Sequence, residues 1–184
     1  MYHPPRFSLR LRLVAAALAF MSLDASAALA VGAAAPTFTT EAATAGEASR
    51  FDLAENLKNG PVVLYFYPKA FTSGCTVEAH QFAEASDKFK ALGARVVGIS
   101  NDDIATLKKF SVEACRNKFS VAADAGAKII RSYDAKLAMV EMADRISYLI
   151  TPDGKIAAVH ASMNADGHVD AMLKAVERWK AGKK

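Results

Sequence analysis

The apolar residues in the middle of the chain form short continuous runs that predict buried strands. Pro61–Tyr67 reads PVVLYFY, and Ala94–Ser100 is a second run that contains several β-branched residues. The first run is typical of a strand that is buried on both faces of a sheet. A shorter strand is predicted over Phe119–Ala123. The sequence therefore predicts that Pro61–Tyr67 is a central strand of a sheet.

Between and after these runs, apolar positions recur at three- and four-residue spacing, which predicts amphipathic helices. The helix after the first strand has its apolar stripe at Phe82, Ala85, Phe89 and Leu92. A second helix is expected from a cap at Asp102 or Asp103 to about Val112. A brief helix is expected around 127–133. The last helix has its stripe at Val169, Met172, Leu173, Val176 and Trp179.

Two predicted strands near the end of the chain, Arg145–Ile150 and Lys155–His160, flank the turn sequence Pro-Asp-Gly. This pattern predicts an antiparallel hairpin. An extended opening over Val31–Thr40 and a loop precede the first buried strand. The order of the elements predicts an α/β fold with a mixed sheet, parallel in its first part and antiparallel at its end, and with helices on both faces. This order matches the thioredoxin-like architecture.

Residues 1–27 have the pattern of a secretory signal peptide. Three arginines precede the apolar stretch Leu13–Leu23, and Ala25–Ala27 forms a small-residue cleavage pattern. A second possible cleavage site follows Ala30. The apolar stretch is shorter than the roughly 20 residues that span a bilayer, so a membrane anchor is the weaker alternative. We therefore expect an exported protein, periplasmic in a bacterium, whose residues 28–184 form one domain.

Charge and composition argue against several classes of function. Loss of residues 1–27, with three arginines and one aspartate, lowers the formal net charge from +4 to +2, which does not suggest nucleic-acid binding. His80, His160 and His168 are dispersed, so no metal is expected. No P-loop or Gly-x-Gly-x-x-Gly occurs, so no nucleotide or flavin cofactor is expected. His168 is expected to cap or pack against the last helix, and Trp179 to anchor the core.

Cys75 is the candidate nucleophile. It follows the strand Pro61–Tyr67 at the first turn of the next predicted helix, where unpaired backbone N–H groups and the helix dipole stabilise a negative charge. The thiolate is the nucleophilic form of cysteine and reacts with electrophiles such as peroxide oxygen. The same N–H groups are suited to bind the oxygens of a substrate. Cysteines at helix starts also occur as inert core residues, so position alone leaves both interpretations open.

The spacing around Cys75 resembles the active-site signature of the peroxiredoxins. Pro68, Thr72 and Cys75 form Pro-x-x-x-Thr-x-x-Cys. The following Thr76-x-Glu78 is similar to the bacterioferritin-comigratory or Q-type branch of this alkyl hydroperoxide reductase/thiol-specific antioxidant family. The similarity covers nearly all of the chain after the signal peptide. It includes the opening segment Val31–Phe38, the strand end Tyr65–Pro68 and the strand and turn Arg145–Gly154.

The resemblance implies roles for the residues around Cys75. Arg145 would reach the thiolate from a neighbouring strand and stabilise both the thiolate and the departing oxygen. Thr72 would hydrogen-bond the thiolate or the peroxide, and Pro68 would shield the pocket from water. Taken singly, each has a simpler explanation: Pro68 ends a strand, Thr72 caps a helix and Arg145 is a solvated charge. Glu78 would orient Arg145 or a backbone group, or only complement the helix dipole.

The same resemblance makes Cys115 the candidate resolving cysteine. Many Q-type members have the second thiol five residues after the first, where this chain has His80; others carry it on the next helix, and Cys115 falls near the end of that helix. A disulfide with Cys75 needs Cα atoms within about 7 Å, so the first turn of the Cys75 helix would have to unwind. The cations Arg116 and Lys118 are expected to favour the Cys115 thiolate. The alternatives are an incidental thiol in a one-cysteine enzyme and a permanent disulfide.

The resemblance implies a thiol peroxidase that reduces hydrogen peroxide and organic hydroperoxides through a Cys75 sulfenic acid and is recycled by a thioredoxin-like protein. A monomer without cofactor or stable membrane association is expected. Two other classes stay open. An exported thiol-disulfide oxidoreductase would normally carry Cys-x-x-Cys, whereas Thr72–Cys75 contains one cysteine. A non-enzymatic binding module would use the two cysteines as a fixed disulfide.

Overall fold

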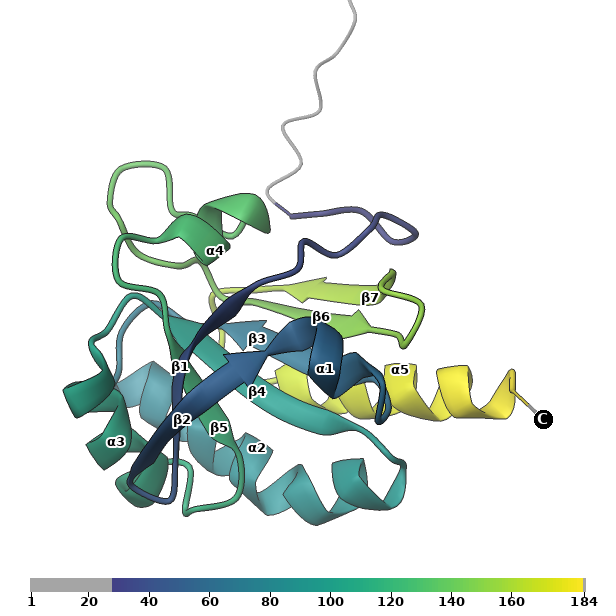
Figure 1. The fold of residues 1–184 in the computed structure, drawn as a ribbon, viewed down its shortest axis with the longest axis horizontal. Coiled ribbons are helices and arrows are strands. Elements are labelled where there is room, and N and C mark those ends of the chain that lie inside the picture. Colours follow the sequence, from purple (N-terminus) through teal and green to yellow (C-terminus); the bar gives the residue numbers. More distant parts are fainter. Residues whose placement is uncertain (1–27, 184) are drawn as a thin grey trace, which may run out of the picture.

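The computed structural model describes residues 28–183 as a seven-stranded sheet with helices on both faces (Figure 1). The signal peptide predicted for residues 1–27 lies outside the described residues. The strands are β1 (Thr39–Thr44), β2 (Glu47–Asp52), β3 (Val62–Phe66), β4 (Arg95–Ser100), β5 (Ser120–Ala123), β6 (Ile146–Ile150) and β7 (Ile156–Ala161). The helices are α1 (Leu53–Leu57), α2 (Ser73–Ala91), α3 (Ile104–Glu113), α4 (Lys128–Ser132) and α5 (His168–Ala181).

The sheet has the strand order β2-β1-β5-β4-β3-β6-β7. β4 pairs in parallel with β3 and with β5. The other pairs, β1 with β2, β1 with β5, β3 with β6 and β6 with β7, are antiparallel. All five residues of β3 are buried, as expected for a central strand covered on both faces. The predicted mixed α/β sheet of the thioredoxin-like type is therefore confirmed.

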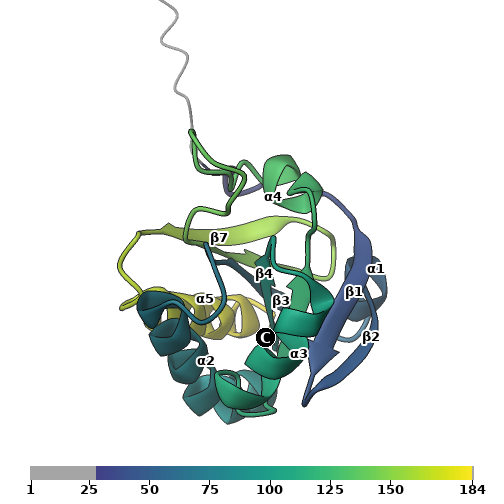
Figure 2. The same ribbon diagram turned by 90° about the vertical axis from the view of Figure 1, so that its left-hand side faces the viewer.

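Two hydrophobic cores lie on the two faces of this sheet. α2, α3 and α5 cover one face, and α1 and α4 cover the other. Figures 1 and 2 show α2 and α5 side by side. The predicted apolar stripes of these helices meet in one core, which contains Phe82 and Phe89 of α2 and Met172 and Val176 of α5. Trp179 is half-buried against the same core.

The first hairpin and α1 are elements that the sequence pattern does not indicate. β1 and β2 occupy the end of the extended segment predicted over Val31–Thr40 and the loop predicted after it. The hairpin turns at Ala45 and Gly46, whose φ angles of 51° and 83° are those of a two-residue hairpin turn. Alanine is unusual at such a position, and four of the six β2 residues are exposed. Neither the turn nor the strand therefore has a strong sequence signal.

The later elements agree with the pattern of the sequence. The second predicted helix, α3, begins after Asp103, whose side chain accepts a hydrogen bond from Thr106 N–H at 2.7 Å. β6 and β7 form the predicted antiparallel hairpin. Within residues 28–183, no helix is long and apolar enough to cross a membrane.

Candidate active site

Cys75 is the third residue of α2 and is almost fully buried, with 1% of its surface exposed. Thr72 occupies the N-cap position, and Thr76 N–H makes the first bond of the helix to the Thr72 carbonyl at 2.9 Å. The backbone N–H groups of Ser73, Gly74 and Cys75 precede that bond in the first turn. Together with the helix dipole they favour negative charge at the sulfur.

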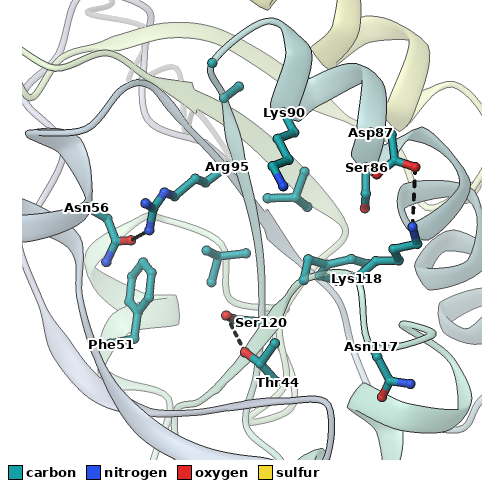
Figure 3. Close-up of a pocket in the computed structure, with 15 residues that line it drawn as sticks. Thr44, Phe51, Asn56, Ser86, Asp87, Lys90, Arg95, Asn117, Lys118 and Ser120 are labelled. Atoms are coloured by element: carbon teal, nitrogen blue, oxygen red, sulfur yellow. Dashed lines mark hydrogen bonds and ion pairs between the residues drawn. The ribbon is translucent and has the colours of Figure 1, made fainter.

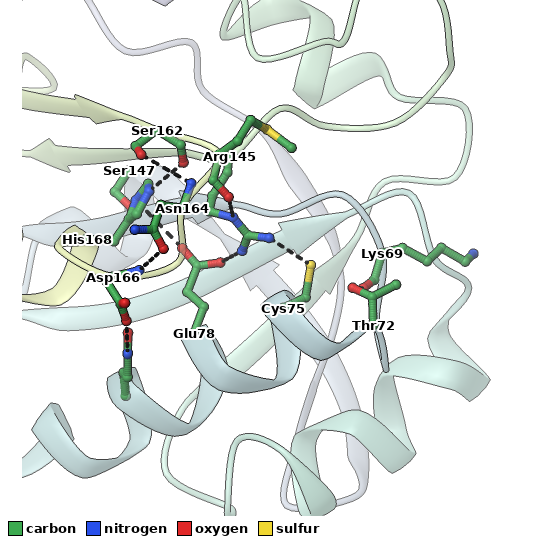
Figure 4. Close-up of polar contacts among 12 residues, drawn as sticks. Lys69, Thr72, Cys75, Glu78, Arg145, Ser147, Ser162, Asn164, Asp166 and His168 are labelled. Atoms are coloured by element: carbon green, nitrogen blue, oxygen red, sulfur yellow. Dashed lines mark hydrogen bonds and ion pairs between the residues drawn. The ribbon is translucent and has the colours of Figure 1, made fainter.

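Arg145 reaches Cys75 from the neighbouring strand (Figure 4). β6 pairs antiparallel with β3, and Ile146 lies opposite Phe66, so Arg145 is placed beside the carboxyl end of β3. Its Nη2 donates to the Cys75 sulfur at 3.4 Å, and its Nε donates to the Met163 carbonyl at 3.1 Å. Arg145 is 4% exposed, so it is a buried cation at the sulfur and not a solvated strand-end charge.

Glu78 holds the other side of the Arg145 guanidinium, as Figure 4 shows. Its Oε2 accepts from Arg145 Nη1 in a buried ion pair. Burial raises the pKa of Glu78 to about 7, because desolvation outweighs the stabilisation of the carboxylate by Arg145. Its other oxygen, Oε1, is buried without a hydrogen-bond partner among the described residues. Glu78 therefore orients Arg145 and is more than a complement to the helix dipole.

His168 extends this buried network, and the pattern of the sequence does not reveal it. Its Nε2 lies 2.9 Å from the Ser162 carbonyl, and its Nδ1 lies 2.8 Å from Ser147 Oγ and 3.6 Å from Glu78 Oε1. Burial lowers the pKa of His168 to about 4, so the ring is neutral at pH 7. Of the two roles expected for His168, capping of the last helix is wrong, because the N-cap of α5 is Gly167, whereas the side chain does pack in the interior. No sequence spacing joins residues 78 and 168; the β6–β7 hairpin and α5 bring them together.

The shifted pKa values of Glu78 and His168 predict opposite effects of pH on folding stability. Folded Glu78 keeps its proton up to about pH 7, whereas the unfolded carboxyl loses it near 4.5, so Glu78 lowers stability as pH rises from 4.5 to 7. Unfolded His168 gains a proton below 6.5, whereas the folded ring does so only near 4, so His168 raises stability as pH rises from 4 to 6.5. The two contributions largely cancel where they overlap.

Single substitutions are expected to separate these contributions. Relative to the parent, Glu78→Gln should gain stability as pH rises between 4.5 and 7, and His168→Asn should lose stability as pH rises between 4 and 6.5. Each change is on the order of 3 kcal/mol. Urea unfolding of the reduced proteins at several pH values measures both differences. If the free energy of unfolding, relative to the parent, changed with pH in the same direction in both variants, the assigned pKa shifts would be contradicted.

The Thr72 hydroxyl does not contact the Cys75 sulfur. It is exposed and donates to the Lys69 carbonyl at 2.9 Å. The expected hydrogen bond from Thr72 to the thiolate is therefore wrong for this structure, and the alternative bond to a peroxide stays a prediction. The simpler explanation also fails in part, because Thr72 occupies the N-cap position by its backbone but makes no side-chain cap bond. The tight turn before it, with Phe71 at a φ of 65°, accounts for the bond to Lys69.

Asp102 holds the loop between β3 and α2, a role that the pattern of the sequence does not indicate. Its buried carboxylate accepts from Ala70 N–H at 2.8 Å and from Ser100 Oγ at 2.9 Å, and it pairs with Lys69. These contacts tie the end of β4 to the loop that follows Pro68. Pro68 itself is half-buried directly after the end of the β3 run. Asp102 therefore supports the loop that leads to Cys75, while Asp103 caps α3.

Asp102→Ala is expected to lower the free energy of unfolding by about 2–4 kcal/mol, because it removes charge-assisted bonds and leaves the buried Ala70 N–H unpaired. Asp103→Ala is the matched control. It removes an exposed helix cap and is expected to cost about 1 kcal/mol. Chemical denaturation of both variants measures the difference. A larger loss in Asp103→Ala would contradict the role given to Asp102.

Cys115 directly follows the C-cap residue of α3 and is fully buried. Both cysteines are free thiols in the same hydrophobic core, so the structure contains no permanent disulfide between them. Burial raises the pKa of the Cys115 thiol. The expectation that Arg116 and Lys118 favour its thiolate is wrong. Their side chains extend to α2 instead, where they pair with surface carboxylates at 3.2 Å and 3.3 Å.

A separate cleft lies near the amino ends of β4 and β5 (Figure 3). It has a volume of about 530 Å³, and Lys90, Arg95 and Lys118 are among the residues that line it. Lys118 pairs there with Asp87 at 3.3 Å. Cys75, in contrast, follows the carboxyl end of β3. Of the described residues that line the cleft, none is a residue predicted for catalysis, so the predicted chemistry lies elsewhere.

A buried arginine held against the sulfur of a helix-start cysteine, on a thioredoxin-like sheet, is an arrangement typical of proteins with thiol redox chemistry. Comparison with known proteins agrees with this class. The model of the AhpC/TSA family matches residues 31–159, and the chain belongs to this family. Within the family, its sequence is similar to peroxiredoxins of the Q type.

Individual relatives support this placement. Chloroplastic peroxiredoxin Q of Oryza sativa subsp. japonica is 31% identical over 148 residues, which cover 79% of this chain and 66% of the rice protein. Chloroplastic peroxiredoxin Q of Gentiana triflora is 34% identical over 119 residues, 64% of this chain and 54% of that protein. The chain thus spans less than two thirds of the length of these plant relatives. The crystal structure of peroxidoxin BcpB from Mycobacterium tuberculosis matches with a TM-score of 0.72 and 29% identity over 80% of this chain and 96% of that one.

Proposed function

We propose that this protein is a thiol peroxidase in which Cys75 attacks a hydroperoxide. The observation that carries the proposal is the 3.4 Å contact between Arg145 Nη2 and the Cys75 sulfur at the start of α2. Membership of the AhpC/TSA family supports it. The thiolate attacks the terminal peroxide oxygen, so that an S–O bond forms and the O–O bond breaks. Cys75 becomes a sulfenic acid, and the departing oxygen takes a proton and leaves as water or an alcohol.

The residues around the sulfur have proposed supporting roles. Arg145 stabilises the thiolate and the negative charge that develops on the departing oxygen, because a guanidinium has several fixed donors. Pro68 shields the sulfur from water and supports the loop. The Thr72 hydroxyl is exposed beside the helix start, so its proposed partner is the bound peroxide.

Cys115 is the proposed resolving cysteine. Its thiol attacks the sulfenic sulfur, an S–S bond forms, and water leaves. Both sulfurs are buried, so the first turn of α2 and the segment after α3 must open for this step. Arg116 and Asn117 have φ angles of 50° and 60°, a left-handed conformation that costs on the order of 1 kcal/mol per residue. The segment that carries Cys115 is therefore already strained in the reduced protein.

Cys115→Ser tests this assignment. The variant is expected to keep its first reaction with peroxide but to lose at least about tenfold in thioredoxin-driven turnover, because its sulfenic acid has no internal thiol partner. A coupled assay with thioredoxin and its reductase measures turnover. Ala114→Ser, which places a hydroxyl at the neighbouring buried position and keeps the thiol, is the control. Equal turnover in the parent and in Cys115→Ser would make this a one-cysteine enzyme.

The proposed substrates are hydrogen peroxide and organic hydroperoxides. Return of the Cys75–Cys115 disulfide to two thiols needs an attacking thiolate from outside, and a thioredoxin-like protein is the proposed donor. The signal-peptide pattern of residues 1–27 supports export, to the periplasm in a bacterium. The protein is proposed to act as a monomer and without a cofactor, since the thiol carries out the redox step itself.

A further inference from the structure

Two buried titratable groups, Glu78 and His168, face each other beside the proposed nucleophile. Glu78 Oε1 and His168 Nδ1 lie 3.6 Å apart, and neither side chain has exposed surface. Glu78 Oε1 has no hydrogen-bond partner among the described residues. A buried polar atom without a partner costs about 1–3 kcal/mol, and more if it is charged. Whether Glu78 carries a proton therefore affects how much of the charge of Arg145 is available to Cys75.

The hydrogen bonds of His168 determine which ring nitrogen carries its proton. The Ser162 carbonyl oxygen, 2.9 Å from Nε2, can only accept, so Nε2 is the donor. In a neutral ring Nδ1 is then an acceptor with one lone pair, which the Ser147 hydroxyl at 2.8 Å and Glu78 Oε1 at 3.6 Å both face. An ionised Glu78 would direct the lone pairs of Oε1 at the lone pair of Nδ1. One proton between Oε1 and Nδ1 removes this conflict.

We propose that Glu78 and His168 hold one proton between them while Cys75 is a thiolate, which leaves the charge of Arg145 to Cys75. The inference rests on the proposed function, and it makes His168 a positioning residue that acts through Glu78. With the proton on Oε1, the neutral carboxyl still accepts from Arg145 Nη1 through Oε2, and its O–H faces His168 Nδ1 at 3.6 Å. The buried cluster then contains one cation and one anion.

The groups around the pair determine which of its members keeps the proton. Those that face it from the packed elements are Cys75 on α2, Tyr65 on β3, Arg145 before β6 and His160 on β7. Arg145 favours an ionised Glu78, whereas burial and a Cys75 thiolate favour the neutral carboxyl. Burial, Arg145 and His160 all disfavour an imidazolium at residue 168. With pKa values of about 7 for Glu78 and about 4 for His168, the carboxyl keeps the proton.

Loss of this proton at alkaline pH has a chemical consequence. Two buried anions, Glu78 and the Cys75 thiolate, would then compete for the guanidinium of Arg145, and like charges in one site disfavour each other. The rate constant of Cys75 with hydrogen peroxide is therefore expected to decline above neutral pH. Glu78→Gln places a permanently neutral amide where the protonated carboxyl stood, so this variant is expected to lose the decline.

The direct test is spectroscopic and uses the purified, reduced protein without peroxide. NMR of protein with ¹⁵N-labelled histidine is expected to show His168 as the neutral Nε2–H tautomer at pH 7. Infrared spectroscopy is expected to show a protonated carboxyl at pH 6, below the pKa of about 7 of Glu78, that disappears in Glu78→Gln. An imidazolium at His168, or a parent protein without the protonated carboxyl, would overturn the proposal. An imidazolium at His168 can be recognised on the parent alone, so this contradicting result does not depend on the folding of Glu78→Gln.

The kinetic test measures the rate constant of Cys75 with hydrogen peroxide across pH. His168→Leu is expected to lower it about tenfold at neutral pH, because an apolar side chain leaves the Glu78 proton without the ring nitrogen that it faces. His168→Asn retains an oxygen acceptor and is expected to recover most of the loss. His80→Asn, which changes a histidine outside this network, is the control and should keep the parent's pH profile.

Two kinetic outcomes would contradict the role of the pair. One is an alkaline decline that survives in Glu78→Gln, and the other is a His168→Leu variant that reacts as fast as His80→Asn. A parent protein whose Cys75 does not react with peroxide at any pH would refute the proposed function instead. In that case the NMR and infrared measurements would still show whether Glu78 and His168 hold a proton.

Discussion

Arg145→Ala is expected to lower the rate constant of Cys75 with hydrogen peroxide by about 10²–10³-fold, the range found when one preorganised donor to a developing negative charge is removed. In the parent, Arg145 Nη2 donates to the Cys75 sulfur at 3.4 Å from a buried position. Its loss removes the cation that stabilises the thiolate and the donor for the departing oxygen. Rapid mixing with peroxide, followed by quenching and intact mass, measures the rate constant.

Two further variants test whether the effect depends on the guanidinium at position 145. Arg145→Lys keeps a cation without the planar fork and is expected to fall between the parent and Arg145→Ala. Arg131→Ala removes a surface arginine that pairs with Glu141, and it is expected to react as the parent does. An Arg145→Ala rate constant within about threefold of the parent would refute the role of Arg145 in stabilising charge at the sulfur.

Cys75→Ser is expected to abolish peroxide reduction altogether. A serine hydroxyl is a weak nucleophile at neutral pH and has no sulfur to accept the oxygen, so consumption of peroxide should fall to that of a blank without protein. Serine is close to cysteine in size, and the buried site should therefore remain folded. Peroxide consumption with thioredoxin and its reductase measures the effect, and circular dichroism checks the fold. Residual turnover above the blank would place the chemistry at another residue.

The central elements of the fold follow from the hydrophobic pattern because their burial leaves no polar face. β3 and β4 read as continuous apolar runs, and α2 and α5 bury regular stripes. The hairpin of β1 and β2 does not follow from the pattern, because it lies at the exposed edge and turns on Ala45 and Gly46. The turn contains neither asparagine nor aspartate, and β2 has one buried residue, Phe51, so the sequence pattern of this hairpin is weak.

Some residues of the candidate site can likewise be predicted from the sequence, and others cannot. Cys75 is placed by a local feature, the junction of β3 and α2, so its position at the helix start can be predicted. The contact with Arg145 was expected from the resemblance to a family, since only the pairing of β3 with β6 brings these residues together. Asp102 and His168 act through contacts between distant segments, and neither has a spacing that signals its role.

The side chains of Thr72 and of the cations after Cys115 depend on backbone geometry that residue type does not determine. The turn before α2 directs the Thr72 hydroxyl to the Lys69 carbonyl. The left-handed residues Arg116 and Asn117 form the turn after Cys115, and the arginine there reaches α2 instead of the thiol. Charge next to a cysteine in the sequence is therefore a poor guide to charge next to its sulfur.

The claim that Cys75 receives the peroxide oxygen is tested most directly by intact mass and peptide mapping after one equivalent of hydrogen peroxide. Cys115→Ser, in which the oxidised state cannot pass to an internal disulfide, is predicted to gain one oxygen atom, located on Cys75. The parent is predicted to lose two protons as the Cys75–Cys115 disulfide forms. An unchanged mass in the reduced Cys115→Ser protein, or an oxygen atom located on another residue, would contradict the account.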